Sequence, residues 1–318
     1  MSRAELLTAL EARLGRIHAR QRLGIETEHE HQVFRVGFSG ARKFFHPENW
    51  YSIQAMIRGC LRLVGLYDRA QRNARQIEAV ENHVRLARLP AEFHGYRILH
   101  LSDLHIDASD QMAHAIIEAV RPLDYDVCVL TGDYRFRTSG EVGPTIENMR
   151  RLRANLTGEV YAVFGNHDSV LMLPEFEQMG IGMLMNEHVR IDRDGAALYL
   201  AGIDDAHYFG VGNLEKALAA VPADATTVLL SHTPEVYRQA AHSTVDLLLC
   251  GHTHGGQICL PGGYPVILDA RIPRRLGRGA WDHAGMQGYT SPGAGSSVVE
   301  VRLNCPPEVT IHHLLSGA

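Results

Sequence analysis

Long hydrophobic runs are missing from this chain of 318 residues. No stretch of about 18 uninterrupted apolar residues is present, so we expect no membrane-spanning helix. The N-terminal stretch MSRAELLTALEARLGRIHAR carries charges throughout and lacks the apolar core of a secretory signal peptide. These two absences predict a cytoplasmic protein.

Cysteine is scarce and shows no pairing pattern. The chain has five cysteines, an odd number, and none forms a CxxC pair. This argues against a disulfide framework and against a zinc–thiolate site. Cys128 and Cys250 lie inside apolar runs, and we expect them to be small core residues.

Charge is moderate in amount but unevenly distributed. Residues 1–75 hold 13 Lys/Arg against 7 Asp/Glu, a net of +6, whereas the whole chain carries −5 and the remainder therefore −11. A basic N-terminal part on an acidic body suggests an anionic partner, although a solvated helix face is the more common explanation. Because no RNA-recognition or helix-turn-helix signature is present, no specific nucleic-acid partner is expected.

Residues 1–80 are predicted to form a basic, helical N-terminal appendage, followed by a main domain over 81–318. Within the appendage we expect an Arg-rich amphipathic helix ending near Gly24, and loops at 27–32 and 39–50. Apolar residues recur at helical spacing over 50–66, and a polar helix is expected to continue to about residue 80. For the apolar face near 50–66, core packing or dimerisation is favoured over an interfacial helix that binds anionic lipid.

From about residue 83, short apolar runs alternate with helical segments. The predicted strands are residues 83–89, 96–102, 126–132, 160–166, 181–186, 197–203, 226–232, 245–251, 287–292, 296–303 and 308–314. The predicted helices are residues 111–120, 145–156 and 213–221. This alternation predicts an α/β (α+β) fold, a four-layer αββα sandwich of two mixed β-sheets flanked by helices, with the N-terminal helical appendage beside it.

Five of the predicted strands run into polar clusters. The clusters are Asp103-Leu104-His105, Gly132-Asp133, Gly165-Asn166-His167-Asp168, Ser231-His232 and Gly251-His252-Thr253-His254. In α/β architectures, ligands gather at the carboxyl ends of the strands. Carboxylate oxygens and imidazole nitrogens suit divalent ions such as manganese, iron and zinc. The clusters therefore predict a metal centre.

The spacing within the clusters favours two adjacent ions. Asp103 and His105 are two positions apart, so on an extended strand they share a face and can hold one ion. Asp133 has two carboxylate oxygens and can bridge two ions. His252 and His254 lie in a glycine-bounded loop that lets each reach a different ion. Two metals about 3.5–4 Å apart can clamp a phosphate and ionise a bridging water.

The ordered blocks SDLH, TGD, GNHD, SH and GHTHGG resemble the pattern of the calcineurin-like metallophosphoesterases, which is D-x-H, G-D, G-N-H-D/E, a histidine and G-H-x-H. The match covers residues 99–256 and implies that 81–318 is the catalytic domain. GHTHGGQICLPGG and VEVRLNCPPEVTIHHL further resemble the bacterial branch that includes lipid A-type pyrophosphatases and YaeI/YkuE-like phosphodiesterases.

The resemblance implies a role for each matched residue. It implies seven metal ligands: Asp103, His105 and His254 on one ion, Asn166, His232 and His252 on the other, and Asp133 on both. His167 would contact the phosphate and protonate the leaving oxygen or stabilise its charge, and Asp168 would orient His167. A metal-bridging hydroxide would attack phosphorus in line. Of two divalent ions, manganese is favoured, with iron or zinc as alternatives.

Three further residues are candidates for substrate contacts. Arg135 and Arg137 follow the second block, and arginine binds phosphate in a bidentate manner, although an exposed charged loop is the alternative. His207 lies in a loop that would border the cleft. The other histidines, among them His100 and His312, are expected to be structural.

The leading prediction is a binuclear metal-dependent phosphodiesterase that hydrolyses a phosphodiester or pyrophosphate bond. A nucleotide-linked lipid is one substrate class, with peripheral contact at the inner membrane face through the N-terminal segment. The alternatives are a UDP-2,3-diacylglucosamine-type pyrophosphatase of lipid A synthesis and a soluble cyclic or linear nucleotide phosphodiesterase. A non-catalytic scaffold is disfavoured because every ligand and His167 are present.

Overall fold

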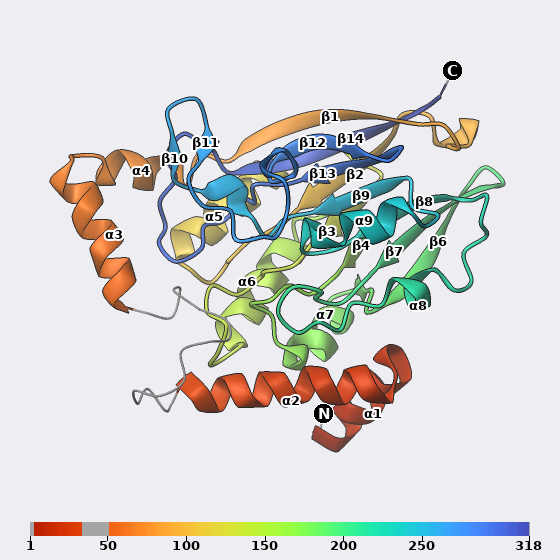
Figure 1. Cartoon of the computed structure of the whole chain (residues 1–318), viewed down its shortest axis with the longest axis horizontal. Coiled ribbons are helices and arrows are strands. Elements are labelled where there is room, and N and C mark those ends of the chain that lie inside the picture. Colours follow the sequence, from red (N-terminus) through yellow and green to blue (C-terminus); the bar gives the residue numbers. More distant parts are fainter. Residues whose placement is uncertain (1–2, 34–50, 318) are drawn as a thin grey trace.

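The computed structural model describes residues 3–33 and 51–317 (Figure 1). Two helices open the chain, α1 (Arg3–Leu14) and α2 (Arg16–Val33), and both lie along the bottom of the view. The break between them is at Gly15, whose φ of +81° lies in the left-handed region.

The predicted helix end near Gly24 and the predicted loop at 27–32 are both wrong, since α2 runs through them. Contacts with distant loops stabilise this extension. The Glu26 carboxylate accepts a hydrogen bond from the Val170 N–H at 3.2 Å, and Glu30 accepts one from the Gly140 N–H at 3.1 Å. Tertiary contacts thus override a weak local helix signal. The predicted loop at 39–50 lies outside the described residues.

Helices α3 (Tyr51–Leu63) and α4 (Tyr67–Asn73) follow, and the chain then enters strand β1 (Glu78–Leu86). The predicted helix to about residue 80 is therefore wrong at its end. Strand β1 pairs in parallel with β14 (Glu308–Ser316) over its whole length. This pairing provides hydrogen-bond partners for the backbone of a segment whose polar composition had suggested a helix.

The first sheet has six strands in the order β1-β14-β2-β3-β4-β5. Its remaining strands are β2 (Tyr96–Leu101), β3 (Val127–Leu130), β4 (Glu159–Ala162) and β5 (Ile181–Met183). Strands β2 to β5 are parallel, whereas β14 is antiparallel to β2. The carboxyl ends of three of these strands therefore lie at one edge of the sheet, where predicted ligands follow.

The second sheet also has six strands, in the order β12-β13-β9-β8-β7-β6. These are β6 (Glu187–Arg193), β7 (Ala196–Gly202), β8 (Thr226–Leu230), β9 (Leu247–Cys250), β12 (Gly279–His283) and β13 (Met286–Thr290). A small hairpin, β10 (Cys259–Leu260) and β11 (Tyr264–Pro265), lies apart from both sheets.

The predicted strand at 296–303 is wrong. Only an isolated bridge joins Leu303 to Ile258 there. Val299 and Val301 are buried against Leu61 of α3, and the backbone N–H of Arg302 donates to the Ala70 carbonyl of α4. The apolar residues of this segment were read correctly as buried, but they pack against helices instead of joining a sheet.

Helices cover the outer face of each sheet. Helices α5 (Asp110–Val120), α6 (Gly143–Arg153) and α7 (Leu173–Gln178) share a hydrophobic cluster with the first sheet, and α8 (Leu214–Leu218) and α9 (Tyr237–Ala241) share one with the second. A third cluster fills the space between the sheets. The predicted four-layer sandwich of two mixed sheets is therefore confirmed. The 3₁₀ helices are Ala91–Phe93, Val170–Met172, Pro234–Val236, His254–Gly256 and Arg274–Leu276.

Strand alternation explains how the layers form. In β3, Cys128 and Leu130 face the helices while Val127 and Val129 face the other sheet. Helix α1 packs its leucines into the same cluster as α5 to α7. The division into 1–80 and 81–318 remains a prediction. Within the described ranges, no helix combines the length and apolar composition needed to cross a bilayer.

Candidate metal centre

The predicted ligands follow strands of both sheets at their carboxyl ends. Asp103 and His105 come after β2, Asp133 after β3, Asn166 after β4, His232 after β8, and His252 and His254 after β9. Five of them have a left-handed backbone: Asp103 (φ 50°), His105 (39°), Asp133 (57°), His252 (71°) and His254 (50°). Non-glycine residues seldom adopt this conformation, and such strain is concentrated at functional sites.

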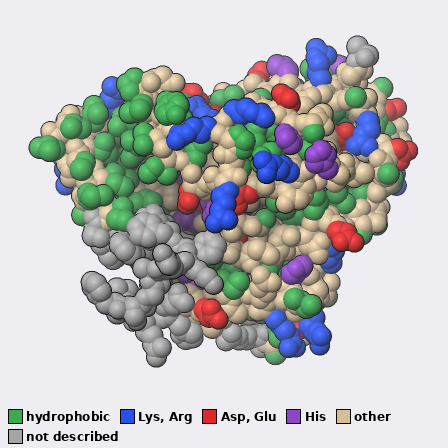
Figure 2. Space-filling model, viewed as in Figure 1, with side chains coloured by type: hydrophobic (Ala, Val, Ile, Leu, Met, Phe, Trp, Pro, Cys, Tyr) green, Lys and Arg blue, Asp and Glu red, His purple; other side chains and the backbone are tan. Residues whose placement is uncertain are grey.

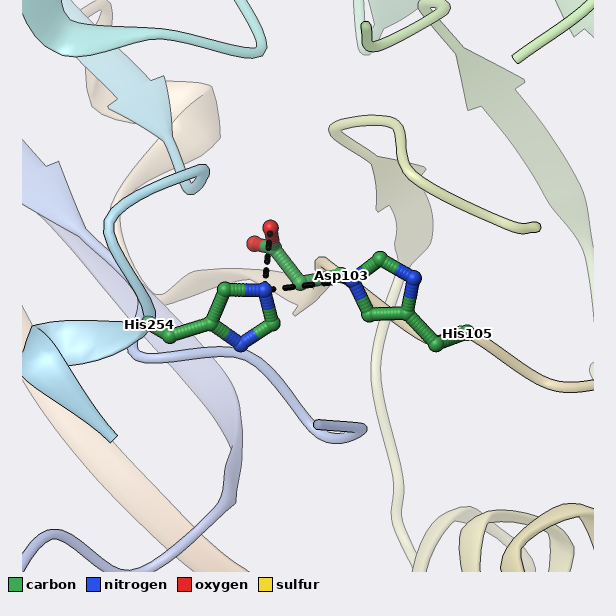
Figure 3. Close-up of side chains that lie close together, drawn as sticks. All are labelled: Asp103, His105 and His254. Carbon is green, nitrogen blue, oxygen red and sulfur yellow. Dashed lines mark hydrogen bonds and ion pairs between the residues drawn. The ribbon is translucent and has the colours of Figure 1, made fainter. Parts of the chain in front are cut away.

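The expected reason for the pairing of Asp103 with His105 was wrong. Strand β2 ends at Leu101, so the two residues do not share the face of an extended strand. Two successive left-handed turns bring their side chains together instead. Figure 3 shows His105 and His254 facing each other with Asp103 beside them. The Nε2 atoms of the two imidazoles are 3.1 Å apart, and Asp103 Oδ1 is 3.5 Å from His254 Nε2.

A second group of ligand atoms surrounds His232. Its Nε2 lies 3.0 Å from Asn166 Oδ1, 3.2 Å from Asp133 Oδ2 and 3.2 Å from His252 Nδ1. Asp133 also faces the first group, because its Oδ2 is 4.0 Å from His105 Nε2. The structure thus brings all seven predicted ligands together, in two groups that meet at the Asp133 carboxylate.

The hydrogen-bond geometry shows that a cation fits here. His232 Nδ1 is 2.7 Å from the Thr131 carbonyl oxygen and donates to it, so Nε2 is the nitrogen that faces the other ligand atoms. Because Asp133 Oδ2 and Asn166 Oδ1 lie 3.2 and 3.0 Å from this Nε2, it holds a proton in the absence of an ion, and a bound cation would replace that proton. Burial alone would lower the pKa of His232, but the Asp133 carboxylate raises it to about 10. The pocket therefore favours added positive charge, as a divalent ion would supply.

The pKa values of the two neighbouring carboxylates also depend on the charges in this pocket. Burial would raise the pKa of Asp133, but the imidazoles of His232 and His167 hold it well below its usual range. Burial, followed by the charge of Asp133, raises the pKa of Asp168 to about 6. Asp133 is thus the carboxylate most firmly held in the anionic form that a metal ligand needs.

His167 and Asp168 border this centre from the loop after β4. His167 Nδ1 is 3.0 Å from the Phe136 carbonyl, and its Nε2 is 3.8 Å from Asp133 Oδ2. The Asp168 carboxylate accepts hydrogen bonds from the backbone N–H groups of Gly165, Asp133 and Tyr134 at 2.8, 2.8 and 2.9 Å. An orienting effect of Asp168 on His167 would therefore pass through the loop backbone.

Two glycines permit the close approach of the loops. A Cβ atom on Gly251 would lie 1.9 Å from Ser102 Oγ and 2.1 Å from Asp103 Oδ2. A Cβ atom on Gly165 would lie 2.2 Å from Asp133 Oδ1. The glycines before His252 and Asn166 are therefore required by space at the ligands themselves.

A buried polar chain supports Asp103 from behind. It consists of Asn82, His312, His100, Thr131 and Ser102. Ser102 Oγ donates to Asp103 Oδ2 at 2.6 Å, and Thr131 Oγ1 donates to Ser102 Oγ at 2.7 Å. His100 and His312, expected to be merely structural, thus support a ligand through neighbouring hydroxyls. The available signal was a polar residue inside an apolar strand, which in the case of His100 stands three positions before Asp103.

The two histidines of this hydrogen-bonded chain should make the free energy of unfolding depend on pH. Burial lowers the pKa of His100 to about 3, and burial also holds that of His312 well below its usual range. Only the unfolded chain binds these protons as pH falls below about 6.5, so stability should fall by about 1.4 kcal/mol per pH unit for each histidine. We expect His312→Gln to remove one such contribution in urea unfolding of metal-stripped protein between neutral and mildly acidic pH. The exposed His114→Gln is the control, and an unchanged slope in His312→Gln would contradict the assignment.

Arg302 is a site residue that the sequence did not reveal. Its guanidinium is fully buried and donates to the carbonyl oxygens of His254 at 3.2 Å and Pro292 at 2.7 Å. It thereby ties the His254 loop to the segment after β13. The available signal was a single arginine in a valine-rich run. It was missed because residues 296–303 were incorrectly predicted to form a strand.

The substrate candidates differ in their placement. Arg135 is buried and donates to the Gly140 carbonyl at 3.0 Å, so its guanidinium holds its own loop. Arg137 is exposed. His207 borders the second ligand group, with its ring centroid 4.3 Å from that of His252, and its Nδ1 is 3.0 Å from Glu235 Oε2. Burial would lower the pKa of His207, but Glu235 raises it.

Helix α2 reaches the site, which was not foreseen. The buried Arg22 donates to the Asp168 carbonyl oxygen at 2.7 Å. Its Nε is 3.5 Å from Asp204 Oδ2, and its guanidinium carbon lies 3.2 Å from the centroid of the Phe209 ring. One arginine of the N-terminal helix therefore joins two loops that border the metal centre.

Comparisons with known proteins agree with this geometry. The family model described as calcineurin-like phosphoesterase matches residues 96–256. The uncharacterized metallophosphoesterase YkoQ of Bacillus subtilis is 30% identical over 68% of this chain and 83% of its own length. The phosphodiesterase YaeI of Escherichia coli is 31% identical over 69% of this chain and 82% of its own length.

Other similar proteins are longer, and this chain covers less than two thirds of their length. A bovine transmembrane protein with metallophosphoesterase domain is 30% identical over 81% of this chain, which spans 61% of that protein. Among solved structures, a 5'-nucleotidase precursor from Thermus thermophilus aligns with a TM-score of 0.43 at 13% identity, over 69% of this chain and 54% of its own. On the strength of the family model and the sequence relatives, this chain belongs to the calcineurin-like phosphoesterase family and is a metal-dependent phosphoester hydrolase.

Proposed function

We propose that the protein is a binuclear phosphodiesterase, which hydrolyses a phosphodiester or pyrophosphate bond. Asp103, His105 and His254 would hold one divalent ion, Asn166, His232 and His252 the second, and Asp133 both. The observation that carries this proposal is the cluster of oxygen and nitrogen atoms from Asn166, Asp133 and His252 around His232 Nε2. Bound divalent ions would supply Lewis acidity and a water of lowered pKa.

The protein's own groups would position the ester beside these ligands. The His167 ring is fixed through its Nδ1 at the Phe136 carbonyl, which leaves Nε2 directed toward the metal centre. From there a protonated Nε2 can contact a phosphate oxygen and deliver a proton to the leaving oxygen. His207, held by Glu235 at the edge of the second group, would contact a more distant part of the substrate.

A diester is favoured over a monoester by the relatives, because one of them is named a phosphodiesterase. The test is hydrolysis of bis(p-nitrophenyl) phosphate and p-nitrophenyl phosphate by metal-stripped protein refilled with Mn²⁺, Fe²⁺ or Zn²⁺. Faster metal-dependent cleavage of the diester supports the proposal, with Mn²⁺ expected to be the most effective ion. Equal or faster cleavage of the monoester would contradict the diester preference.

The natural substrate is the finer part of the proposal. A nucleotide-linked lipid and a cyclic or linear nucleotide both contain the required bond. A panel of cyclic nucleotides beside a nucleoside diphosphate joined to an acyl chain separates them. The lipid hypothesis requires that only the acylated substrate approaches the rate seen with the nitrophenyl diester.

The role of His167 predicts a dependence on the leaving group. We expect His167→Asn to lower kcat by about a hundredfold or more for a diester with a poor leaving group such as methanol. The loss should be much smaller for p-nitrophenolate, which leaves without a proton. Metal content, measured by mass spectrometry, should remain at the wild-type value. Equal losses for both leaving groups would assign His167 to phosphate binding alone.

A further inference from the structure

An exposed apolar surface lies on two elements that border each other. On α3 and the turn after it, Met56, Leu63 and Val64 are 60, 89 and 63% exposed. On and after the hairpin of β10 and β11, Leu260, Tyr264, Val266 and Ile267 are 52, 55, 52 and 74% exposed. We call these seven residues the apolar rim. Figure 2 shows hydrophobic side chains gathered over this protruding part of the molecule, at the upper left.

Packing beneath the rim joins its two parts. Leu61 of α3 is buried in a small cluster with Val299 and Val301, and Ile258, just before β10, packs against the same cluster. In Figure 1, α4 lies beside β10 and β11. The two parts of the rim therefore lie on elements that share one small hydrophobic cluster.

Several apolar side chains of helix α3 remain exposed instead of packing against the rest of the protein. Its apolar residues recur at helical spacing from Ile53 to Val64 and cover one broad face. Among the described residues, Leu61 of that face is buried and Ile57 packs partly against the same cluster, whereas Met56, Leu63 and Val64 are largely exposed. Exposed apolar side chains gathered in this way are typical of an interaction site.

The two segments that carry the rim are strongly basic. Residues 51–75 and 257–278 contain nine arginines and two aspartates, with no lysine and no glutamate. Their net charge of +7 contrasts with −5 for the whole chain. Two of the arginines lie over tyrosine rings, Arg62 at 4.7 Å from Tyr67 and Arg274 at 5.1 Å from Tyr264. Basic residues beside exposed apolar side chains complement a surface of anionic lipid headgroups.

We propose that the apolar rim binds the surface of an anionic lipid bilayer. The apolar side chains enter the boundary between headgroups and acyl chains, and the arginines pair with the headgroups. The rim protrudes from the body of the protein, which suits a fluid surface better than a single peptide. Strand β10 begins five residues after His254, so binding would bring the metal centre close to the bilayer. This inference is independent of which ester is hydrolysed.

The test is flotation of the full chain with vesicles of phosphatidylcholine, alone or mixed with phosphatidylglycerol. The variants are Leu63→Ser with Val64→Ser, and Val266→Ser with Ile267→Ser. Each pair should lower the partition coefficient on the mixed vesicles by about tenfold or more. The matched control is Ile17→Ser with Leu171→Ser, which are 75 and 56% exposed but lie away from the rim. It should bind as the wild type does.

Further measurements distinguish a bilayer from a second copy of the protein as the partner of the apolar rim. Raising the salt concentration should weaken wild-type binding, because exposed charges are screened. Hydrolysis of soluble bis(p-nitrophenyl) phosphate should be unchanged in all variants, which shows that they fold. No flotation of the wild type with phosphatidylglycerol vesicles would overturn the proposal. A concentration-dependent dimer that the rim variants dissociate, without vesicle binding, would also overturn it and assign the rim to a second copy.

Discussion

Asp133→Asn is expected to reduce kcat/KM for a phosphodiester by at least about a thousandfold, or about 4 kcal/mol of transition-state stabilisation. The Asp133 carboxylate faces both ligand groups, at 3.2 Å from His232 Nε2 and 4.0 Å from His105 Nε2. The amide removes its negative charge and places hydrogen atoms toward these imidazoles. The protein should remain folded, because the side chain keeps its shape and its Oδ1 still accepts from the His167 N–H.

Metal content provides a readout besides activity. Isothermal titration of metal-stripped protein with Mn²⁺ should show two sites in the wild type and at most one in Asp133→Asn. Asp192→Asn, at an exposed aspartate of β6, is the matched control and should retain both sites and full activity. Two tight sites and wild-type turnover in Asp133→Asn would refute the bridging role.

Arg22→Met is expected to have the largest effect on stability, lowering the free energy of unfolding by about 3–5 kcal/mol. The guanidinium of Arg22 is fully buried, and its loss leaves the equally buried Asp204 without its cation. It also removes the hydrogen bond to the Asp168 carbonyl and the contact with the Phe209 ring. Arg22→Met should therefore lower activity as well, by loosening the loop that carries His167.

Urea unfolding of metal-stripped protein measures this effect. Arg20→Met, on the same helix but at an exposed arginine, is the matched control and should change stability by less than about 0.5 kcal/mol. Adding Asp204→Asn to Arg22→Met should restore part of the loss, because the buried charge is then removed. A loss no greater than that of Arg20→Met would show that α2 is not energetically coupled to the site.

Both N-terminal helices contact the rest of the protein through residues other than Arg22. Alongside Arg22, helix α2 carries Glu26, which accepts from the Val170 N–H, and Gln21, which donates to the Phe209 carbonyl at 3.1 Å. Helix α1 supplies leucines to the core beneath the first sheet. A segment first regarded as an appendage therefore positions loops around the metal centre.

The sequence by itself determined the core of the fold and which side chains gather at the candidate metal centre. Each ligand stands directly after an apolar strand, and strand periodicity and glycine-bounded ends are local signals. Parallel strands necessarily bring their carboxyl ends to one edge, so the ligand types after β2, β3, β4, β8 and β9 were enough to predict their convergence.

Only the tertiary structure decided the remaining features, because they depend on partners far away in the chain. Local propensity predicted a single helix ending near Gly24, whereas the structure has two helices, and contacts of Glu26 and Glu30 with distant loops extend the second to Val33. The apolar run at 296–303 matched a strand but is held by α3 and α4. The left-handed backbone at Asp103 and His105 leaves no local pattern. The apolar face of α3 and the arginine at position 302 are visible in the sequence, but the exposure of the first and the burial of the second depend on which residues lie opposite.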